Sequence, residues 1–167
     1  MSMASGRNAV TMSDGEIEQF LADNMKVQIA TIGPDGSPHL TTLFYVLEDG
    51  LLAFWTYGRS QKVVNLRRDP RMSFLVETGQ TYDQLRGVAL EGRGVVIEDR
   101  DVVWDVCVDI FNRYNGEYSE EMKPFVEFMA KNRVVVRLDV DRVRSWDHRK
   151  LGMPAMELGG STADFIE

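Results

Sequence analysis

A short basic segment, TYGRSQKVVNLRRDPR (residues 56–71), stands out in a chain that is acidic as a whole. Residues 59–71 hold five basic side chains and one acidic one, a local charge of +4, whereas the whole chain of 167 residues carries −7. Positive charge confined to one segment differs from the broad basic face that a nucleic-acid surface needs. The segment therefore indicates a small anionic ligand, and no nucleic-acid partner is expected.

The chemistry of this segment is that of a phosphate cradle. A β-prone run ending in FWTYG turns through Arg59 and Ser60 into a predicted helix, which brings backbone N–H groups, a hydroxyl and positive charge together. Ser60 would cap the helix and donate its hydroxyl, while Arg59 and Lys62 would neutralise the anion. A cation in the first helical turn opposes the helix dipole unless an anion is present. The alternative is a solvated loop, with Arg67 and Arg68 complementing the C-terminal end of the helix.

The composition fits one domain of an ordinary soluble protein, with 44% hydrophobic and 27% charged residues. The single cysteine, Cys107, excludes an intrachain disulfide framework, and no Cys/His cluster has the spacing of metal ligands, so no metal is expected. Neither an apolar run of membrane-spanning length nor the apolar core of a signal peptide is found. We expect a reduced, cytoplasmic protein with no membrane partner.

Apolar periodicity predicts a mainly β (α+β) fold. Ser13 and Glu16 form a capping-box pattern before a short helix. Further helices are predicted at residues 61–69, from Asp99 or Asp101 to 114, and at 122–129. Six strands are predicted at residues 26–32, 38–47, 51–57, 71–77, 87–98 and 134–140. The first three form an antiparallel meander, and Gly92 and Gly94 indicate a bend or bulge in the fifth. Strands joined mostly by tight turns indicate an antiparallel barrel.

We expect one domain, residues 13–150, between a flexible N-terminus (residues 1–12) and a C-terminal tail (residues 151–167). Both ends are rich in small and polar residues and show little periodicity. Four apolar residues of the tail could still become ordered against a partner chain: Met153, Met156, Phe165 and Ile166.

Residues 30–77 resemble the pyridoxamine 5′-phosphate oxidase-like superfamily, the FMN- and F420-binding split β-barrels. The shared order is a strand, the turn DGSP, a strand, a hairpin, a strand and a basic Ser-x-Lys turn into NLRRDPR. The resemblance continues through EGRGVVIED. It implies a six-stranded antiparallel split β-barrel with a few flanking helices, and a homodimer with a flavin-type cofactor at the interface.

The resemblance also implies the residues of the cofactor site. The cofactor phosphate would be held by Arg59, Ser60 and Lys62. The tricyclic ring would be lined by His39, Leu40, Thr41, Thr42, Trp55, Thr56 and Tyr57. Neighbouring strand residues point in opposite directions, so at most one of Thr41 and Thr42 faces the ring. The structural alternatives are a core position for Trp55 and an exposed turn for His39.

The cofactor expected from the resemblance is F420, with FMN as the alternative. Residues 37–71 resemble the actinobacterial F420-dependent branch, and Arg67, Arg68 and Arg71 could form a track for the acidic oligoglutamate tail of F420. The expected activity is hydride transfer between F420 and a small organic substrate. An FMN-dependent oxidoreductase of the same superfamily, or a non-catalytic binder of a flavin or hydrophobic ligand, stays open.

No catalytic residue is assigned. The sequence contains only two histidines and no nucleophile signature. It therefore offers neither a Ser/His/Asp triad nor a pair of catalytic carboxylates. Tyr45, Tyr57 or His39 could protonate a reduced substrate. Residues 146–149 (Trp, Asp, His, Arg) resemble the Trp/Arg ending that reaches the active site in the oxidases, although a surface turn would also fit. The pyridoxal-binding residues of the oxidases are not matched, so the resemblance favours a member other than the vitamin B6 enzyme.

Overall fold

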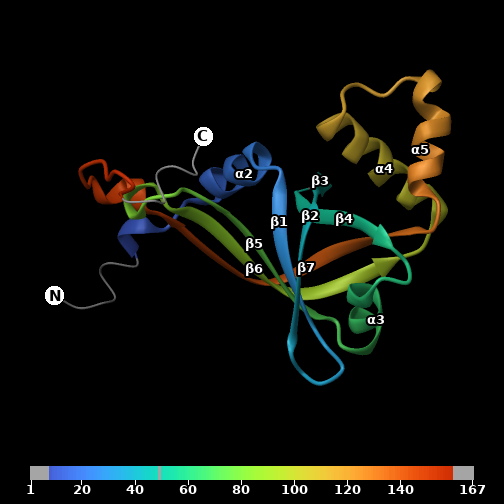
Figure 1. The fold of residues 1–167 in the computed structure, drawn as a ribbon, viewed down its shortest axis with the longest axis horizontal. Coiled ribbons are helices and arrows are strands. Elements are labelled where there is room, and N and C mark those ends of the chain that lie inside the picture. The colour runs from blue at the N-terminus through green and yellow to red at the C-terminus, as the bar shows by residue number, and fades with distance from the viewer. Residues whose placement is uncertain (1–7, 49, 160–167) are drawn as a thin grey trace.

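The computed structural model describes residues 8–48 and 50–159, and its centre is a curled antiparallel sheet flanked by helices (Figure 1). The strand order is β2-β1-β5-β6-β7-β4-β3. The strands are β1 (Lys26–Ile32), β2 (Pro38–Phe44), β3 (Val46–Glu48), β4 (Leu51–Tyr57), β5 (Arg71–Thr78), β6 (Arg86–Ile97) and β7 (Arg133–Asp147). The helices are α2 (Asp14–Asp23), α3 (Gln61–Arg68), α4 (Arg100–Tyr114) and α5 (Lys123–Ala130), with short 3-10 turns η1 (Tyr82–Gln84), η2 (Glu120–Met122) and η3 (His148–Leu151).

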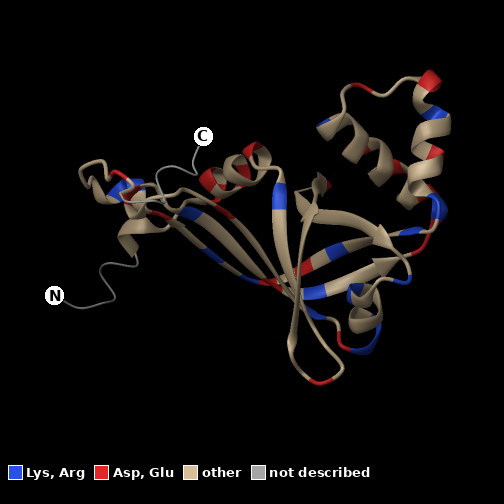
Figure 2. Ribbon diagram, viewed as in Figure 1, with Lys and Arg blue, Asp and Glu red and all other residues tan. Residues whose placement is uncertain are grey.

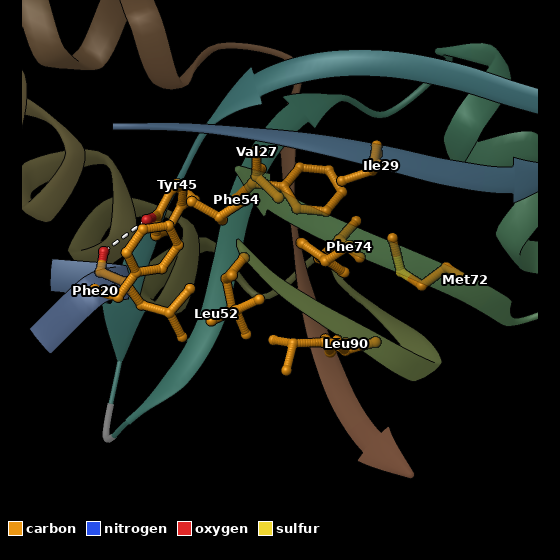
Figure 3. Packing of buried hydrophobic residues seen from close by; sticks show 14 of the residues in the cluster. Phe20, Val27, Ile29, Tyr45, Leu52, Phe54, Met72, Phe74 and Leu90 are labelled. Atoms are coloured by element: carbon orange, nitrogen blue, oxygen red, sulfur yellow. Dashed lines mark hydrogen bonds between the residues drawn. The ribbon is translucent and has the colours of Figure 1, made fainter. Parts of the chain in front are cut away.

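The sheet curls around an apolar core because alternate residues of each strand are buried on the same face. Val27 and Ile29 of β1 are fully buried, and so are Leu52 and Phe54 of β4. Figure 3 shows these side chains converging with Phe74 of β5, whose ring lies 5.8 Å from that of Phe54. These strands coincide with the β-prone runs from which they were predicted. The mainly β, antiparallel architecture is therefore confirmed.

The sheet has seven strands where six were expected, because the predicted strand 38–47 breaks at Tyr45. The first part, β2, pairs with β1, and the second part, β3, pairs with β4. At the break, the Tyr114 hydroxyl accepts from the Tyr45 N–H (3.1 Å) and donates to the Tyr45 carbonyl (2.6 Å), replacing strand ladder bonds. The expected meander is thus corrected: β2 and β4 do not pair, and a split separates them.

The helices begin where the sequence predicts. Ser13 and Glu16 form the capping box of α2, with the Glu16 carboxylate accepting from the Ser13 N–H at 2.7 Å. Asp99 caps α4 by accepting hydrogen bonds from two backbone N–H groups of its first turn.

Helices α4 and α5 pack against β4 and β7 and bury a second apolar cluster that includes Cys107. Burial raises the pKa of the Cys107 thiol to about 12, so the thiol stays protonated at neutral pH.

Strands β5, β6 and β7 extend well beyond the core as an arm (Figure 1). The register shifts between Glu91 and Gly92, which confirms the bulge predicted at Gly92. A side chain at Gly92 would collide with the carbonyl oxygen of Asp139. At Gly94 an added Cβ would lie 2.8 Å from Leu66 of α3, so this glycine lets α3 approach β6 closely.

The residues that resemble the oxidase ending lie at the tip of this arm. Trp146 and Asp147 end β7, and His148 and Arg149 begin η3. The Nδ1 atom of His148 lies 2.8 Å from the carbonyl oxygen of Tyr82, and Arg149 pairs with Asp147 at 2.7 Å. Figure 1 places η3 at the opposite end of the molecule from α3. These residues therefore do not meet the basic segment of their own chain.

The predicted domain limits at residues 13 and 150 stay a prediction. Met12 is only 4% exposed, and its N–H donates to the Ser145 hydroxyl at 3.1 Å. In the tail, Met153 and Met156 are exposed, whereas Phe165 and Ile166 lie outside the described residues. Within residues 8–48 and 50–159, no helix combines the length and apolar character needed to span a membrane.

Candidate anion-binding site

Three polar side chains meet where β4 ends and α3 begins. The ammonium group of Lys62 donates to the Thr56 hydroxyl at 3.3 Å, and the hydroxyls of Thr56 and Ser60 lie 3.3 Å apart. The Ser60 N–H donates to the Tyr57 carbonyl at 2.9 Å, which holds the intervening turn closed. Two hydroxyls and an ammonium group at one point suit an oxyanion. We call Thr56, Ser60 and Lys62, together with the neighbouring Arg59, the cradle.

The N-terminus of α3 adds backbone donors to the cradle. Ser60 occupies the N-cap position as predicted, but its hydroxyl does not cap the helix, so that part of the prediction is wrong. Its carbonyl accepts from the N–H groups of Val63 and Val64 at 3.0 and 3.1 Å. The N–H groups of Gln61 and Lys62 have no acceptor within the helix. These two donors, at the positive end of the helix dipole, are available to an anion.

Lys62 lies in surroundings that disfavour its positive charge. Partial burial lowers the pKa of Lys62, and the nearby positive charge of Arg133 lowers it further. No carboxylate pairs with Lys62 among the interactions of the described residues. A bound anion would compensate both effects, because it would supply the opposite charge that the protein does not. Lys62 therefore has the surroundings that favour binding of an anion.

A groove of about 830 Å³ opens beside the cradle and is strongly basic. Its charged lining consists of four arginines and one carboxylate: Arg59, Arg67, Arg100, Arg133 and Glu98. The carboxylate is already paired with Arg67. Figure 2 shows Lys and Arg gathered around α3 and the neighbouring strand ends. The groove therefore extends the positive charge of the cradle over a longer surface.

Sequence reasoning missed Arg133, which links the cradle to the aromatic residues of β4. Its guanidinium lies 3.8 Å from the ring centre of Tyr57 and 4.8 Å from that of Trp55. Its Nε atom is buried without an acceptor among the described residues. Arg133 starts β7 directly opposite Tyr57, a pairing between segments 76 residues apart. The only signal in the sequence is that Arg133 is a basic residue directly before the apolar run of the last predicted strand.

The predicted arginine track is not formed as expected. Arg67 lines the basic groove and pairs with Glu98. Arg68 instead donates to the carbonyl of Ile32, and Arg71 pairs with Asp69 at 2.6 Å. The structure thus keeps one of the three arginines beside the cradle. Arg100 and Arg133, which are distant in sequence, supply the additional positive charge there.

The other predicted ring-binding residues flank the split between β2 and β4. His39 and Thr41 share the face of β2 that lies opposite buried residues of β1, and Leu40 and Thr42 share the other face. The Nδ1 atom of His39 and the hydroxyl of Thr41 are buried, and neither has a hydrogen-bond partner within residues 8–48 and 50–159. Leu40 is 70% exposed. Edge strands such as β2 also present unpaired backbone groups, so both sides of the split offer polar atoms to a ligand.

A buried amide fixes the position of α3 on the sheet. Asn65 and Thr31 are both fully buried, and the Asn65 amide donates to the Thr31 hydroxyl at 3.0 Å. The Gln61 side-chain amide in turn donates to the side-chain oxygen Oδ1 of Asn65 at 2.8 Å. A buried polar pair is costly to separate, so this chain of bonds holds the N-terminus of α3 in place. The predictions did not include Asn65, because its partner comes from a strand 34 residues away.

The acid–base groups near the site are few. Tyr45, a predicted proton donor, is fully buried, its hydroxyl donates to the Leu21 carbonyl at 2.6 Å, and burial raises its pKa to about 12. That candidate is therefore wrong. Tyr57 is 56% exposed beside the groove and stays a candidate. The described residues contain no group of His, Cys, Asp and Glu side chains that could hold a metal ion.

Known proteins resemble this chain in both sequence and fold. Residues 13–147 match the family model described as pyridoxamine 5'-phosphate oxidase. An F420H(2)-dependent biliverdin reductase of Mycobacterium tuberculosis is 28% identical over 138 residues, which span 81% of this chain and 90% of that protein. The crystal structure of a conserved hypothetical protein of the same organism is 50% identical, with a TM-score of 0.91 over 94% of this chain and 98% of that one. An F420 reductase, 20% identical, shares the fold with a TM-score of 0.60 over 75% of this chain and 94% of its own.

Proposed function

The chain belongs to the pyridoxamine 5'-phosphate oxidase family, and from this premise we propose that it is an F420-dependent oxidoreductase acting on a small organic substrate. The observation that carries the proposal is the cradle, where Lys62 and the hydroxyls of Thr56 and Ser60 converge at the N-terminus of α3. These groups match the charge and hydrogen-bonding needs of a phosphate.

In this proposal the cradle holds the cofactor phosphate and the split holds its ring. Arg59 and Lys62 neutralise the phosphate, while the Ser60 hydroxyl and the first N–H groups of α3 bind its oxygens. Trp55 and Tyr57 lie on one side of the split, and residues 39–42 lie on the other. When bound, the reduced cofactor supplies a hydride, and the substrate gains that hydride together with a proton. The protein orients both partners and excludes water from the ring.

The choice of F420 over FMN rests on charge. Both cofactors carry a phosphate and a tricyclic ring, so the cradle accepts either. F420 also carries an acidic oligoglutamate tail, and the groove beside the cradle holds four arginines against one carboxylate. The activity named for the mycobacterial biliverdin reductase points in the same direction. FMN is the second candidate because the groove does not exclude a shorter ligand.

Titration of the purified protein with each cofactor tests the proposal. F420 fluorescence and FMN fluorescence are followed separately as protein is added. We expect F420 to bind more tightly than FMN, and the difference to shrink as salt is raised, because the tail contact is electrostatic. Tight FMN binding without detectable F420 binding would reverse the cofactor choice. Tight F420 binding without turnover of any electron acceptor would favour a non-catalytic carrier.

We also propose a homodimer in which each copy completes the other's site. The tip of the arm carries Trp146, His148 and Arg149 and lies at the opposite end of the molecule from α3. In a dimer the tip of one copy can reach the split of the other, which its own chain does not allow. Exposed apolar side chains at the tip (Tyr82 and Leu151) and farther along the arm (Val143) are suited to burial against a partner.

A further inference from the structure

Helix α5 is attached to the rest of the protein less firmly than α4 is. Arg113 of α4 donates to two carbonyls of α2 at 3.0 and 3.1 Å, and the Tyr114 hydroxyl bonds to both backbone groups at the break in the sheet. In contrast, no side chain of residues 119–131 forms a hydrogen bond or an ion pair within the described part of the chain. The burial of Val126 and Ala130 is the main attachment of α5.

The packing beneath α5 is incomplete. A small hollow of about 20 Å³ lies between α5, α4 and β4, where Phe125 and Met129 face Trp55 and Cys107. Phe125 is also 48% exposed, and its ring contacts that of Phe111 at 6.1 Å between the ring centres. With a gap on one side and solvent on the other, Phe125 makes fewer packing contacts than a core residue does. Lifting it therefore requires little free energy.

Positive backbone torsions mark both ends of this segment. Gly116, which follows α4, has a φ of 120°, and Asn132, which precedes β7, has a φ of 63°. Among the described residues, Asn132 is the only one other than glycine with a positive φ. Hinge motions are absorbed by a few residues at the ends of elements such as these. Residues 117–131 are thus delimited as one unit, which we call the α5 segment.

The hinge at Asn132 is held by residues of the basic groove. The N–H of Gly58, in the turn of the cradle, donates to the Asn132 carbonyl at 3.0 Å. Arg100 donates to the carbonyls of Ala130 and Arg133, on either side of the hinge, at 3.3 Å each. Gly58, Arg100 and Asn132 all line the groove. A guanidinium has five N–H donors, so Arg100 has enough of them to bind an anion and keep both carbonyls. An anion in the groove would therefore stiffen the hinge.

We propose that the α5 segment is a lid over Trp55, and that an anion bound in the cradle and groove closes it. In the open state the segment swings on Gly116 and Asn132 and uncovers Trp55 and Cys107. In the closed state it covers the strand that flanks the split and excludes water from it. The exclusion of water from a cofactor ring rests on the proposed function, whereas the motion of the lid does not.

Cys107 reports on the lid because it is the single cysteine of the chain and lies beneath α5. It is 1% exposed and its thiol is protonated at neutral pH, so a thiol reagent reacts only after the lid has lifted. Labelling of the full-length protein by dithionitrobenzoate is followed at increasing urea and compared with the rate of global unfolding. Amide hydrogen exchange, measured by mass spectrometry, gives a second and independent readout.

We expect Cys107 to be labelled faster than the protein unfolds, and with a shallower dependence on urea, because opening of the lid exposes less surface than unfolding does. Amides of residues 117–131 should exchange together and faster than those of α4. Phe125→Ala should speed labelling about two- to tenfold, since it removes one aromatic contact of the lid. Phe128→Ala is the matched control, because Phe128 belongs to the same helix and is 74% exposed, and its labelling rate should equal that of wild type.

Inorganic phosphate and F420, each compared with sodium chloride of equal ionic strength, test the closing step. Both should slow the labelling of wild type, and Lys62→Ala should lose the effect of phosphate. The inference is overturned if labelling follows global unfolding, if Phe125→Ala and Phe128→Ala are labelled at equal rates, or if phosphate fails to slow labelling. Protection by phosphate that survives in Lys62→Ala would also contradict it. Failure of the proposed function looks different, because F420 would then have no effect while phosphate still slowed the labelling.

Discussion

The ammonium group of Lys62 lies 3.3 Å from the Thr56 hydroxyl, with no carboxylate to balance its charge among the described contacts. Thr56 is 3% exposed and belongs to β4, whereas Lys62 belongs to the first turn of α3. A buried hydroxyl thus anchors a cation at the positive end of a helix. Burial and the charge of Arg133 both lower the pKa of Lys62, so an anion bound here would stabilise its charged form.

Replacing Lys62 separates cofactor binding from stability. Lys62→Ala removes one charge-assisted contact of roughly 1.5–3 kcal/mol, so cofactor affinity should fall about ten- to a hundredfold. Without cofactor the variant should melt at the same temperature or slightly higher, because a cation leaves the positive end of a helix. Fluorescence titration and thermal melting measure the two effects. Arg68→Ala is the control, since Arg68 bonds to the Ile32 carbonyl, and its FMN affinity should barely change. Equal affinity in wild type and Lys62→Ala would show that the cradle is a solvated loop.

The buried bond between Asn65 and Thr31 should show strong coupling. Thr31→Val or Asn65→Leu alone leaves one buried polar partner unsatisfied, and each should cost about 1–3 kcal/mol of unfolding free energy. The double variant replaces both partners by apolar groups and should cost less than the sum of the single changes. Urea denaturation of the four proteins gives the coupling energy. Strictly additive costs would mean that this bond does not hold α3 on the sheet.

Acid sensitivity should depend on Glu16. The contacts with Lys150 and with the Ser13 backbone lower the pKa of Glu16 to about 2, from an ordinary value of 4.5. Because the folded-state pKa is depressed, the carboxylate stabilises the fold fully above pH 4.5 and loses that contribution as pH falls toward 2. Glu16→Gln should therefore lower the melting temperature at pH 7, and its deficit relative to wild type should vanish near pH 2. A deficit that is the same at both pH values would contradict this linkage.

The bulge in β6 should tolerate no side chain. Gly92→Ala drives a Cβ into the carbonyl oxygen of Asp139, and overpacking of this kind typically costs about 1–3 kcal/mol. Gly15→Ala is the matched control, because nothing lies within 4 Å of an added Cβ there and alanine is the better helix former. Chemical denaturation should show a loss for the first variant and a gain of up to about 1 kcal/mol for the second. A neutral Gly92→Ala would mean that the backbone at the bulge shifts easily.

The molecular mass of the protein in solution tests the proposed dimer. Static light scattering at micromolar concentration should give twice the 19.0 kDa of the chain. If the arm completes the partner's site, Arg149→Ala should change substrate turnover while leaving cofactor affinity close to that of wild type. A monomeric mass would contradict both the dimer and the role of the arm tip.

Local patterns in the sequence determined most of the strands and helices of this protein. Runs of β-prone residues bounded by turn residues predicted six strands, the capping box at Ser13 and Glu16 predicted the start of α2, and Gly92 indicated the bulge. Short-range sterics and hydrogen bonding decide these features, so neighbouring residues suffice to predict them. The cluster of charge in residues 59–71 likewise indicated an anion site, because the turn and the helix N-terminus that build it are contiguous.

Contacts between distant segments decided the rest. The break at Tyr45 depends on the hydroxyl of Tyr114 in α4, and it turns a meander into a split sheet. Arg133 reaches the aromatic residues of β4 because β7 returns beside it, whereas Arg68 and Arg71 of the basic segment turn away to other partners. The sequence gives the charge of each side chain but not the partner toward which that side chain points. Only the packing of the sheet and α3 determines which cations face the same groove.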